Sequence, residues 1–281
     1  MNTNKVWFIT GASKGLGLTL AKRLLAQGYA VAATSRKKEA LIQELGEESA
    51  KFLPMQLDLT DNSDVNQGIA HTLRHFGHID IVVNNAGYSQ TGTLEELTDK
   101  EAKNNFNVNV FGTLNVIRNA ALHLRKQNSG HIFNISSVGG YVGNFAGFGI
   151  YCATKFAVAG LSEALAEEMK AFGIHTTLVY PGYFRTQFLE AGSIQTPSKP
   201  IEAYKTARAL EQAHLNEING NQPNDPEKAA AVLIELSKQT APPLHFFMGE
   251  DAYHYARTKI DLIQSAMDEN EALGTSTGFE N

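Results

Sequence analysis

The sequence contains almost no cysteine and no long apolar run. Cys152 is the single cysteine among 281 residues, so no intramolecular disulfide can form, which fits a reducing compartment. Its surroundings lack the spacing of metal ligands, and we expect no metal site. No apolar stretch approaches the ~20 residues that span a bilayer, and the N-terminus lacks the architecture of a signal peptide. These absences indicate a cytoplasmic protein without a membrane partner.

Positive charge is not in excess either. The 24 Lys and Arg residues and the 29 Asp and Glu residues give a formal net charge of -5 at pH 7. Because nucleic acids and anionic lipids attract basic proteins, we expect neither as a partner. A hydrophobic content of 43% is typical of globular proteins with a full core. The first 180 residues contain no linker, and we expect a single domain over residues 1–281.

Short β-branched segments alternate with helical segments along most of the chain. The expected strands cover residues 6–10, 30–34, 52–57, 79–83, 130–135, 174–179 and 244–248. They are apolar on both faces, as is typical of a parallel sheet that helices cover on both sides. The alternation predicts an α/β fold with a doubly wound, mostly parallel seven-stranded sheet.

The helical segments lie between these strands and after them. Helices are expected at residues 16–27, about 100–127 and 150–172, and about 251–273. Thr98 followed by Glu101 is a capping-box pattern that starts the second of them. Residues 187–225 are polar and helical in character, and because they precede the last strand we interpret them as a substrate lid. Residues 274–278, within the C-terminal region 251–281, are expected to be disordered.

The first strand runs into a glycine-rich loop and then into a helix. The loop, residues 10–17, has the spacing G-x-x-x-G-x-G, and its glycines let backbone N–H groups approach a pyrophosphate. A structural turn without a ligand is the alternative interpretation. The predicted cofactor residues in this loop are Gly11, Ser13, Lys14, Gly15, Leu16 and Gly17.

The end of the second strand distinguishes the two nicotinamide cofactors. An acidic residue there bonds the ribose 2′-OH of NAD. This chain has Arg36 instead, and no carboxylate follows until Glu39. Arg36 can form a bidentate contact with a 2′-phosphate, and Lys14 adds a second cation on the same side. The pattern predicts NADP(H) rather than NAD, unless Arg36 is an ordinary surface cation.

Two further clusters follow strands at the edge where open α/β sheets bind ligands. Asp58 and Leu59 come after the third strand and are predicted to contact the adenine. After the fourth strand, Asn84 is expected to brace the sheet. The next residues are expected to let the backbone approach the adenosine ribose: Asn85, Ala86 and Gly87.

Tyr151 and Lys155 are four residues apart in a predicted helix and therefore share one face. A free tyrosine titrates near pH ~10, and an adjacent cation stabilises tyrosinate and lowers its pKa. Lys155 is therefore expected to lower the pKa of Tyr151 and make it an acid–base catalyst. This spacing by itself is common on solvated helix faces, so the assignment depends on the rest of the site.

Together these motifs resemble the short-chain dehydrogenase/reductase family in its ordinary single-domain form. The resemblance spans about residues 5–190, and it includes similarity to hydroxysteroid and retinol dehydrogenase-like members and to bacterial ketoreductases. It implies a Rossmann fold with a helical substrate lid. The residues that carry it are Thr10, Gly11, Gly15, Gly17, Asn84 to Gly87, Asn109, Ser137, Tyr151, Lys155, Pro181 and Gly182.

The resemblance also implies a role for each catalytic residue. Tyr151 is the general acid/base, and Lys155 lowers its pKa and bonds the nicotinamide ribose. Ser137 polarises the substrate carbonyl, and Asn109 holds a relay water near Lys155. Strand alternation sends Ser136 and Ser137 to opposite sides, and the family pattern favours Ser137.

The segment after the sixth strand matches the family's cofactor-binding segment at Pro181, Gly182 and Thr186, and Thr186 is expected to anchor the carboxamide. The implied activity is reversible reduction of a bulky, apolar carbonyl compound with NADPH. An NAD-dependent alcohol dehydrogenase of the same fold and a non-catalytic NADP-binding sensor are the alternatives. The family forms homodimers and homotetramers through the helices at residues 100–127 and 150–172, and we expect one of these assemblies.

Several aromatic residues follow the strands or lie near the lid. They are expected either to line an apolar pocket or only to pack the lid onto the sheet. These residues are Tyr88, Tyr141, Phe145, Phe148, Tyr183, Phe184 and Phe188.

Overall fold

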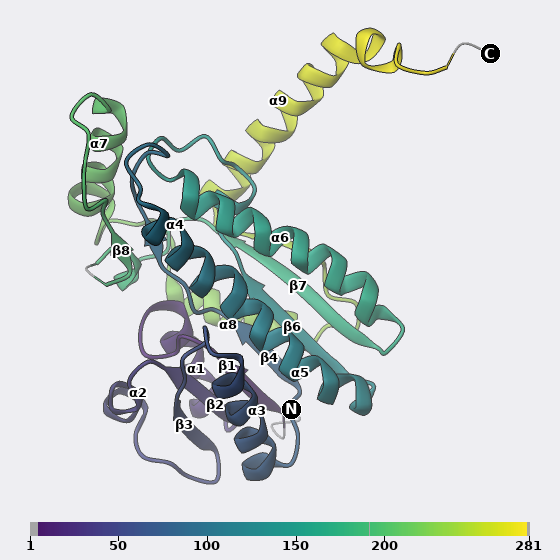
Figure 1. Cartoon of the computed structure of the whole chain (residues 1–281). Coiled ribbons are helices and arrows are strands. Elements are labelled where there is room, and N and C mark those ends of the chain that lie inside the picture. The colour runs from purple at the N-terminus through teal and green to yellow at the C-terminus, as the bar shows by residue number, and fades with distance from the viewer. Residues whose placement is uncertain (1–4, 191, 280–281) are drawn as a thin grey trace.

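A seven-stranded parallel sheet forms the centre of the molecule (Figure 1). The computed structural model describes residues 5–190 and 192–279. The strands lie in the order β3-β2-β1-β4-β6-β7-β9, and every pair is parallel. The doubly wound sheet predicted from the sequence is therefore confirmed. The strands are β1 (Val6–Ile9), β2 (Ala30–Ser35), β3 (Phe52–Gln56), β4 (Ile81–Asn84), β6 (Gly130–Ile135), β7 (Ile174–Pro181) and β9 (His245–Met248).

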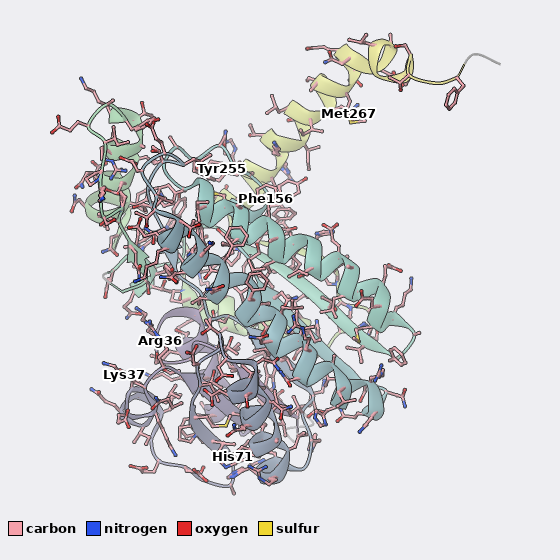
Figure 2. All side chains as sticks on the ribbon, in the orientation of Figure 1. Arg36, Lys37, His71, Phe156, Tyr255 and Met267 are labelled. Carbon is pink, nitrogen blue, oxygen red and sulfur yellow. The ribbon has the colours of Figure 1, made fainter. Side chains whose placement is uncertain are left out.

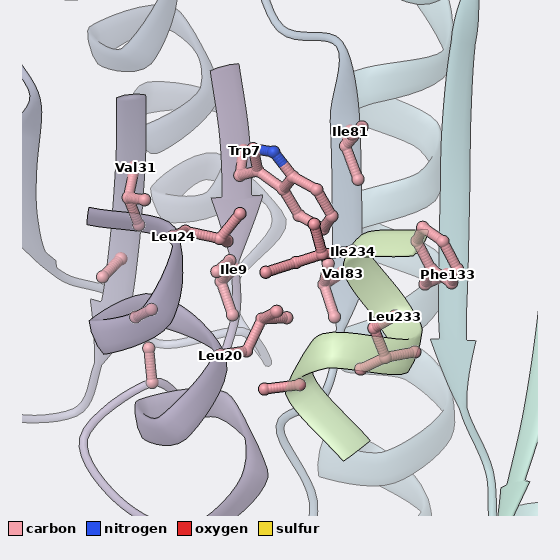
Figure 3. Packing of buried hydrophobic residues seen from close by; sticks show 14 of the residues in the cluster. Trp7, Ile9, Leu20, Leu24, Val31, Ile81, Val83, Phe133, Leu233 and Ile234 are labelled. Carbon is pink, nitrogen blue, oxygen red and sulfur yellow. The ribbon is translucent and has the colours of Figure 1, made fainter. Parts of the chain in front are cut away.

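Helices cover both faces of the sheet, and each face has its own apolar core. Successive strand residues point to opposite sides, so Trp7 and Ile9 enter one core and Phe8 enters the other. Figure 3 shows the first core, where Trp7 and Ile9 pack among side chains of α1 and α8. The second core packs the sheet against α3, α5 and α6. The helices are α1 (Gly15–Ala26), α2 (Lys38–Leu45), α3 (Asn62–Phe76), α4 (Asp99–Phe106), α5 (Thr113–Gln127), α6 (Gly149–Lys170) and α8 (Pro226–Leu236).

The helix predicted at residues 100–127 is present, but its winding changes in the middle. The predicted capping box is confirmed, because Thr98 Oγ1 accepts a hydrogen bond from Glu101 N and Glu101 Oε2 accepts one from Thr98 N. Between α4 and α5 lies a π-helical turn, Asn107–Gly112. Such turns occur frequently at functional sites. The apolar periodicity of the sequence does not reveal this turn, which carries Asn109.

The lid segment, residues 187–225, borders the carboxyl ends of the strands. Its strand β8 (Ile194–Gln195) pairs in parallel with β5 (Ser89–Gln90), and the sequence did not predict this small sheet because two residues show no periodicity. The rest of the segment contains a 3-10 turn (Gln187–Leu189), α7 (Lys205–Gln212) and a π-helical turn (Ala213–Ile218). Its helical character is as predicted.

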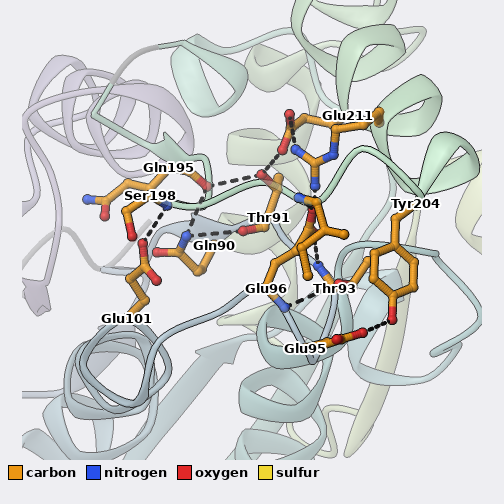
Figure 4. A network of polar contacts seen from close by, with 12 residues as sticks. Gln90, Thr91, Thr93, Glu95, Glu96, Glu101, Gln195, Ser198, Tyr204 and Glu211 are labelled. Carbon is orange, nitrogen blue, oxygen red and sulfur yellow. Dashed lines mark hydrogen bonds and ion pairs between the residues drawn. The ribbon is translucent and has the colours of Figure 1, made fainter.

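A polar network ties the lid segment to the loop before α4 (Figure 4). Arg208 Nη2 lies 2.9 Å from Glu96 Oε2, and Arg208 Nη1 lies 2.7 Å from Glu211 Oε1. Both carboxylates are buried. Thr91 Oγ1 also donates a hydrogen bond to Glu211 Oε2. The lid segment is therefore fixed to the body by charged groups as well as by β5 and β8.

The C-terminal helix α9 (Glu250–Thr275) projects away from the body (Figure 1). It was predicted, but it continues through Gly274 and Thr275, where we expected disorder; the expectation was wrong for these two residues. Apolar side chains on its outer part are exposed, including Met267, which Figure 2 labels. Among the helices of the described residues, not one is long and apolar enough to cross a membrane.

Candidate active site

A cavity of about 560 Å³ opens at the carboxyl ends of the strands. Its volume is in the range of sites for small molecules and cofactors. Most of the predicted site residues line it, whereas Gly17 and Asn109 lie behind its wall. The predicted residues at the cavity are Gly11, Ser13, Lys14, Gly15, Leu16, Arg36, Asp58, Leu59, Asn85, Ala86, Gly87, Ser137, Tyr151, Lys155, Pro181, Gly182 and Thr186.

The glycine loop packs so closely on the loop after β4 that side chains would not fit. A Cβ on Gly11, which has φ +66°, would lie 2.8 Å from the Cα of Ala86. A Cβ on Gly17 would lie 2.5 Å from Asn85 Nδ2. That amide donates hydrogen bonds of 3.0 Å to the carbonyl oxygens of Thr10 and Gly11. The Asn85 side chain therefore shapes the loop at the N-terminus of α1, where a pyrophosphate fits.

Two cations lie at the ribose end of the cavity. Burial lowers the pKa of Lys14, the charge of Arg36 lowers it further and the charge of Glu190 raises it in part. Arg36 and Ser35 line the cavity and Arg36 is exposed, as Figure 2 shows. A site that holds two cations side by side favours an anionic ligand. The groups present fit a dinucleotide that carries a further phosphate.

Tyr151 and Lys155 lie on the cavity-facing side of α6, and both are at most 8% exposed. Lys155 Nζ donates a hydrogen bond of 2.9 Å to Ile135 O and lies 5.9 Å from the centroid of the Tyr151 ring. Burial raises the pKa of Tyr151, and a hydrogen bond with Ser137 lowers it only in part. The expectation that Lys155 lowers this pKa was wrong for the protein alone, because loss of solvation sets the direction of the shift and Lys155 is not among its causes.

The structure distinguishes the two adjacent serines. Ser136 Oγ is buried and donates a hydrogen bond of 3.1 Å to Lys155 O, which ties β6 to α6. Ser137 Oγ accepts a hydrogen bond of 3.0 Å from Gly139 N and also bonds the Tyr151 side chain. Ser137 is therefore the serine beside the phenol, and its role in polarising a carbonyl stays a prediction.

The comparisons with known proteins agree with this geometry. A family model described as short chain dehydrogenase matches residues 5–195. The chain belongs to the short-chain dehydrogenase/reductase family. An oxidoreductase of Botryotinia fuckeliana is 38% identical to this dehydrogenase over 94% of this chain and 96% of the relative. A 3-ketodihydrosphingosine reductase of Bacteroides thetaiotaomicron is 35% identical over 87% and 88% of the two chains.

Solved structures support the same assignment. A short-chain dehydrogenase from Streptomyces avermitilis superposes on this dehydrogenase with a TM-score of 0.89 at 35% identity, covering 98% of this chain and 99% of that one. Structures of this fold have been solved with NAD bound and with NADP bound. Both of these ligands are nicotinamide dinucleotides. The described residues contain no group of three or more His, Cys, Asp or Glu that could hold a metal ion.

In this dehydrogenase Asn109 lies one layer behind the cavity. Its Nδ2 donates hydrogen bonds of 3.0 Å to Tyr88 O and to Thr154 Oγ1, and its Oδ1 accepts one of 3.0 Å from Tyr88 N. A Cβ on Gly87 would lie 3.0 Å from Asn109 Oδ1 and 3.5 Å from Lys155 Nζ. The Asn109 amide therefore holds the loop beside Lys155. Its role in holding a relay water stays a prediction.

Most of the predicted aromatic residues line the cavity, and Tyr141 does not. Its ring packs edge-on against Tyr180 and Phe247, at centroid distances of 5.7 and 5.1 Å. The short 3-10 turn Val138–Gly140 turns it away from the cavity. The aromatic residues at the cavity are Tyr88, Phe145, Phe148, Tyr183, Phe184 and Phe188.

His214, which the sequence did not indicate, also lines the cavity. This histidine is 4% exposed, and its Nε2 lies 2.9 Å from the hydroxyl oxygen of Tyr183. It belongs to the π-helical turn Ala213–Ile218 of the lid segment. A lone histidine in a polar stretch carries no signal of burial, and its partner Tyr183 is distant in sequence.

Lys155 leads to a prediction about pH and stability. Burial lowers the pKa of Lys155 from 10.5 to about 8. Between these two values the unfolded chain binds more protons at this lysine than the folded chain does. Lys155 therefore destabilises the fold at pH 7, and this cost disappears as the pH rises from about 8 to 10.5. Over this range the free energy of unfolding rises by up to ~1.4 kcal/mol per pH unit.

Urea denaturation of the wild type and of Lys155→Met between pH 7 and pH 10 measures this effect. The free energy of unfolding of the wild type should rise with pH relative to that of the variant. Other groups that titrate in this range contribute equally to both proteins. Parallel curves for the two proteins would show that Lys155 keeps an ordinary pKa.

Proposed function

We propose that this dehydrogenase uses NADP(H) to interconvert a ketone or aldehyde and an alcohol. The observation that carries the proposal is one cavity with two differently equipped ends. Tyr151, Ser137 and Lys155 line it near β6 and α6, whereas Lys14 and Arg36 line it after β1 and β2. The first group can protonate an oxygen, and the second can hold a 2′-phosphate.

The residues that would hold the cofactor follow from the lining of the cavity. The glycine loop and the N-terminus of α1 would hold the pyrophosphate. Arg36 and Lys14 would bind the 2′-phosphate. Asp58 and Leu59 would lie against the adenine, and Thr186 near the carboxamide. When bound, the nicotinamide supplies or accepts the hydride.

The protein groups supply the proton and orient the carbonyl. Because burial raises the pKa of Tyr151, its phenol stays protonated at neutral pH and can donate a proton to the carbonyl oxygen. Ser137, which bonds the same phenol, offers a second hydrogen bond to that oxygen. Lys155 lies 5.9 Å from the centre of the phenol ring and can stabilise the tyrosinate that the transfer leaves. A water held near Lys155 and Asn109 would return the proton.

The walls of the cavity favour a bulky, largely apolar substrate. Phe148, Phe188 and Leu189 belong to an apolar cluster that also contains Tyr151. Aromatic walls with few polar groups suit an apolar body that carries one carbonyl. The name of the relative from Bacteroides thetaiotaomicron, a ketone reductase, agrees with this direction and substrate class.

Steady-state kinetics with a panel of ketones and aldehydes test the proposal. We expect turnover with NADPH, and a kcat/KM at least about 10-fold higher with NADPH than with NADH, as one charge-assisted contact provides. A preference for NADH would favour the NAD-dependent alcohol dehydrogenase. Tight binding of NADPH without turnover of any carbonyl would favour a sensor.

We also propose that the protein forms a homodimer or homotetramer through α5 and α6. Phe111 before α5, Leu122 on α5 and Phe156 on α6 are large apolar side chains that are more than 40% exposed. Such residues on neighbouring long helices favour a buried contact with a second copy.

A further inference from the structure

A tyrosine and a histidine form a polar pair in the aromatic part of the cavity, and the mechanism above does not use it. Tyr183 follows β7 and His214 belongs to the lid segment, yet both line the cavity that contains Tyr151. The Tyr183 hydroxyl oxygen lies 2.9 Å from His214 Nε2. Phe148, whose ring packs on His214, belongs to the same apolar cluster as Tyr151. The pair therefore belongs to the wall of the cavity on the side of Tyr151.

The surroundings of His214 determine which of its nitrogens carries the proton. Nδ1 lies 2.8 Å from Leu210 O, and a carbonyl oxygen can only accept a hydrogen bond. Nδ1 must therefore carry hydrogen. Burial lowers the pKa of His214, which keeps the ring neutral near pH 7. In this neutral tautomer Nε2 has only a lone pair.

The tautomer fixes the direction of the next hydrogen bond. Since Nε2 can only accept, the Tyr183 hydroxyl must donate its hydrogen to His214. The phenol oxygen then has no hydrogen left for a ligand and keeps lone pairs that can only accept. A ligand group that meets this oxygen with a donor gains a hydrogen bond, and one that meets it with an acceptor is repelled.

Aromatic and aliphatic side chains form one side of the wall around the pair, which strengthens this preference. The ring centroids of Phe148 and His214 are 4.6 Å apart, and those of Phe188 and Tyr151 are 6.1 Å apart. Leu189 completes this wall. A polar ligand group placed here without a matching partner loses solvation, which costs about 1–3 kcal/mol.

We propose that Tyr183, oriented by His214, is a specificity-determining residue that accepts a hydrogen bond from a donor on the substrate. The preferred substrates are then carbonyl compounds that carry a second group with an O–H or N–H hydrogen, such as hydroxyketones and aminoketones. The inference rests on the proposed function for the identity of the reacting group, but the recognition of a donor is a property of the cavity alone.

Three matched ketones test the preference: benzylacetone, its para-hydroxy derivative and its para-methoxy derivative, each also with a shorter and a longer chain between ring and carbonyl. The hydroxy compound can donate, and the methoxy compound can only accept. At the chain length that fits, we expect kcat/KM for the hydroxy compound to be about 10-fold higher than for benzylacetone, as one hydrogen bond provides. The methoxy compound should show no gain.

Two variants separate recognition from a structural role. Tyr183→Phe should reduce the hydroxy-to-unsubstituted ratio of kcat/KM to about one. His214→Phe removes the acceptor on Nε2, so the Tyr183 hydroxyl regains a hydrogen to donate and the methoxy compound should gain relative to benzylacetone. A loss of packing would lower all three rates together and leave their ratios unchanged. Tyr141→Phe, a tyrosine outside the cavity, is the matched control and should keep the wild-type ratios.

A binding measurement makes the outcome independent of turnover. Calorimetry on the Tyr151→Phe variant with NADPH gives the Kd of each ketone without reaction, and the hydroxy compound should bind most tightly. If the order of affinities holds while the wild type reduces none of the ketones, the proposed function fails and the donor site stands. Equal ratios in the wild type and in Tyr183→Phe, in both rate and affinity, would overturn the donor site.

Discussion

Replacing Tyr151 with phenylalanine should lower kcat for ketone reduction by about 10²–10⁴-fold, the usual contribution of a positioned general acid. The change removes one oxygen atom, and the apolar cluster around the ring keeps its shape. The hydrogen bond from Ser137 cannot replace the missing proton, because a serine hydroxyl is a far weaker acid than the phenol. Single-turnover rates with bound NADPH measure the chemical step.

Tyr141→Phe is the matched control for this prediction. It makes the same chemical change on an aromatic residue that packs against Tyr180 and Phe247 rather than lining the cavity. It should keep kcat within about 2-fold of the wild type, as expected for a change away from the site. If Tyr151→Phe binds NADPH normally and still reduces ketones at the wild-type rate, another group supplies the proton and our mechanism is wrong.

Replacing Arg36 with aspartate should reverse the choice of cofactor. The change removes the contact with a 2′-phosphate, worth about 1.5–3 kcal/mol, and introduces a carboxylate that repels this phosphate. The same carboxylate can bond the ribose hydroxyls of NAD. The ratio of kcat/KM with NADPH to kcat/KM with NADH should fall by about 10³-fold, as ~4 kcal/mol provides.

Lys37 offers a matched control beside Arg36. Both side chains are exposed, as Figure 2 shows, and only Arg36 is among the residues that line the cavity. Lys37→Asp makes the same change in charge, so a general electrostatic effect on an anionic cofactor would appear in both variants. If both variants shift the preference equally, Arg36 acts as a surface cation and the argument for NADP fails.

The parts of the fold that the sequence predicted are those with a strong local signal. Runs such as 6–9 and 30–33 are apolar throughout, as expected for parallel strands that helices cover on both faces. Thr98 followed by Glu101 predicts a capping box, and the structure contains it. The π-helical turn at Asn107–Gly112 and the pairing of β5 with β8 depend on tertiary contacts, and neither changes the pattern of apolar residues.

The site shows the same division. The glycine loop and the residues after each strand could be placed, because a parallel sheet brings the carboxyl ends of its strands to one edge. Contacts with the lid segment could not be predicted, because the conformation of that segment depends on the groups against which it packs. His214 is the example: its burial depends on α7 and on Tyr183, which is distant in sequence. The pKa of Tyr151 was also misjudged, because spacing gives the position of a charge but not the loss of solvent.

The network around Arg208 bears on how ligands enter and leave. Swinging the lid segment outward would pull Arg208 from Glu96, whose side chain is fully buried, and leave that carboxylate without its cation. Opening would exchange this ion pair and the hydrogen bond from Ile201 N to Glu96 Oε1 for contacts with water, and each of the two favours the closed form by about 1.5–3 kcal/mol. The segment then acts as a fixed wall, and ligands pass through the mouth of the cavity. Selection among carbonyl compounds would thus be made by a shape that exists before the substrate arrives, and the rate of entry would depend on the width of that mouth.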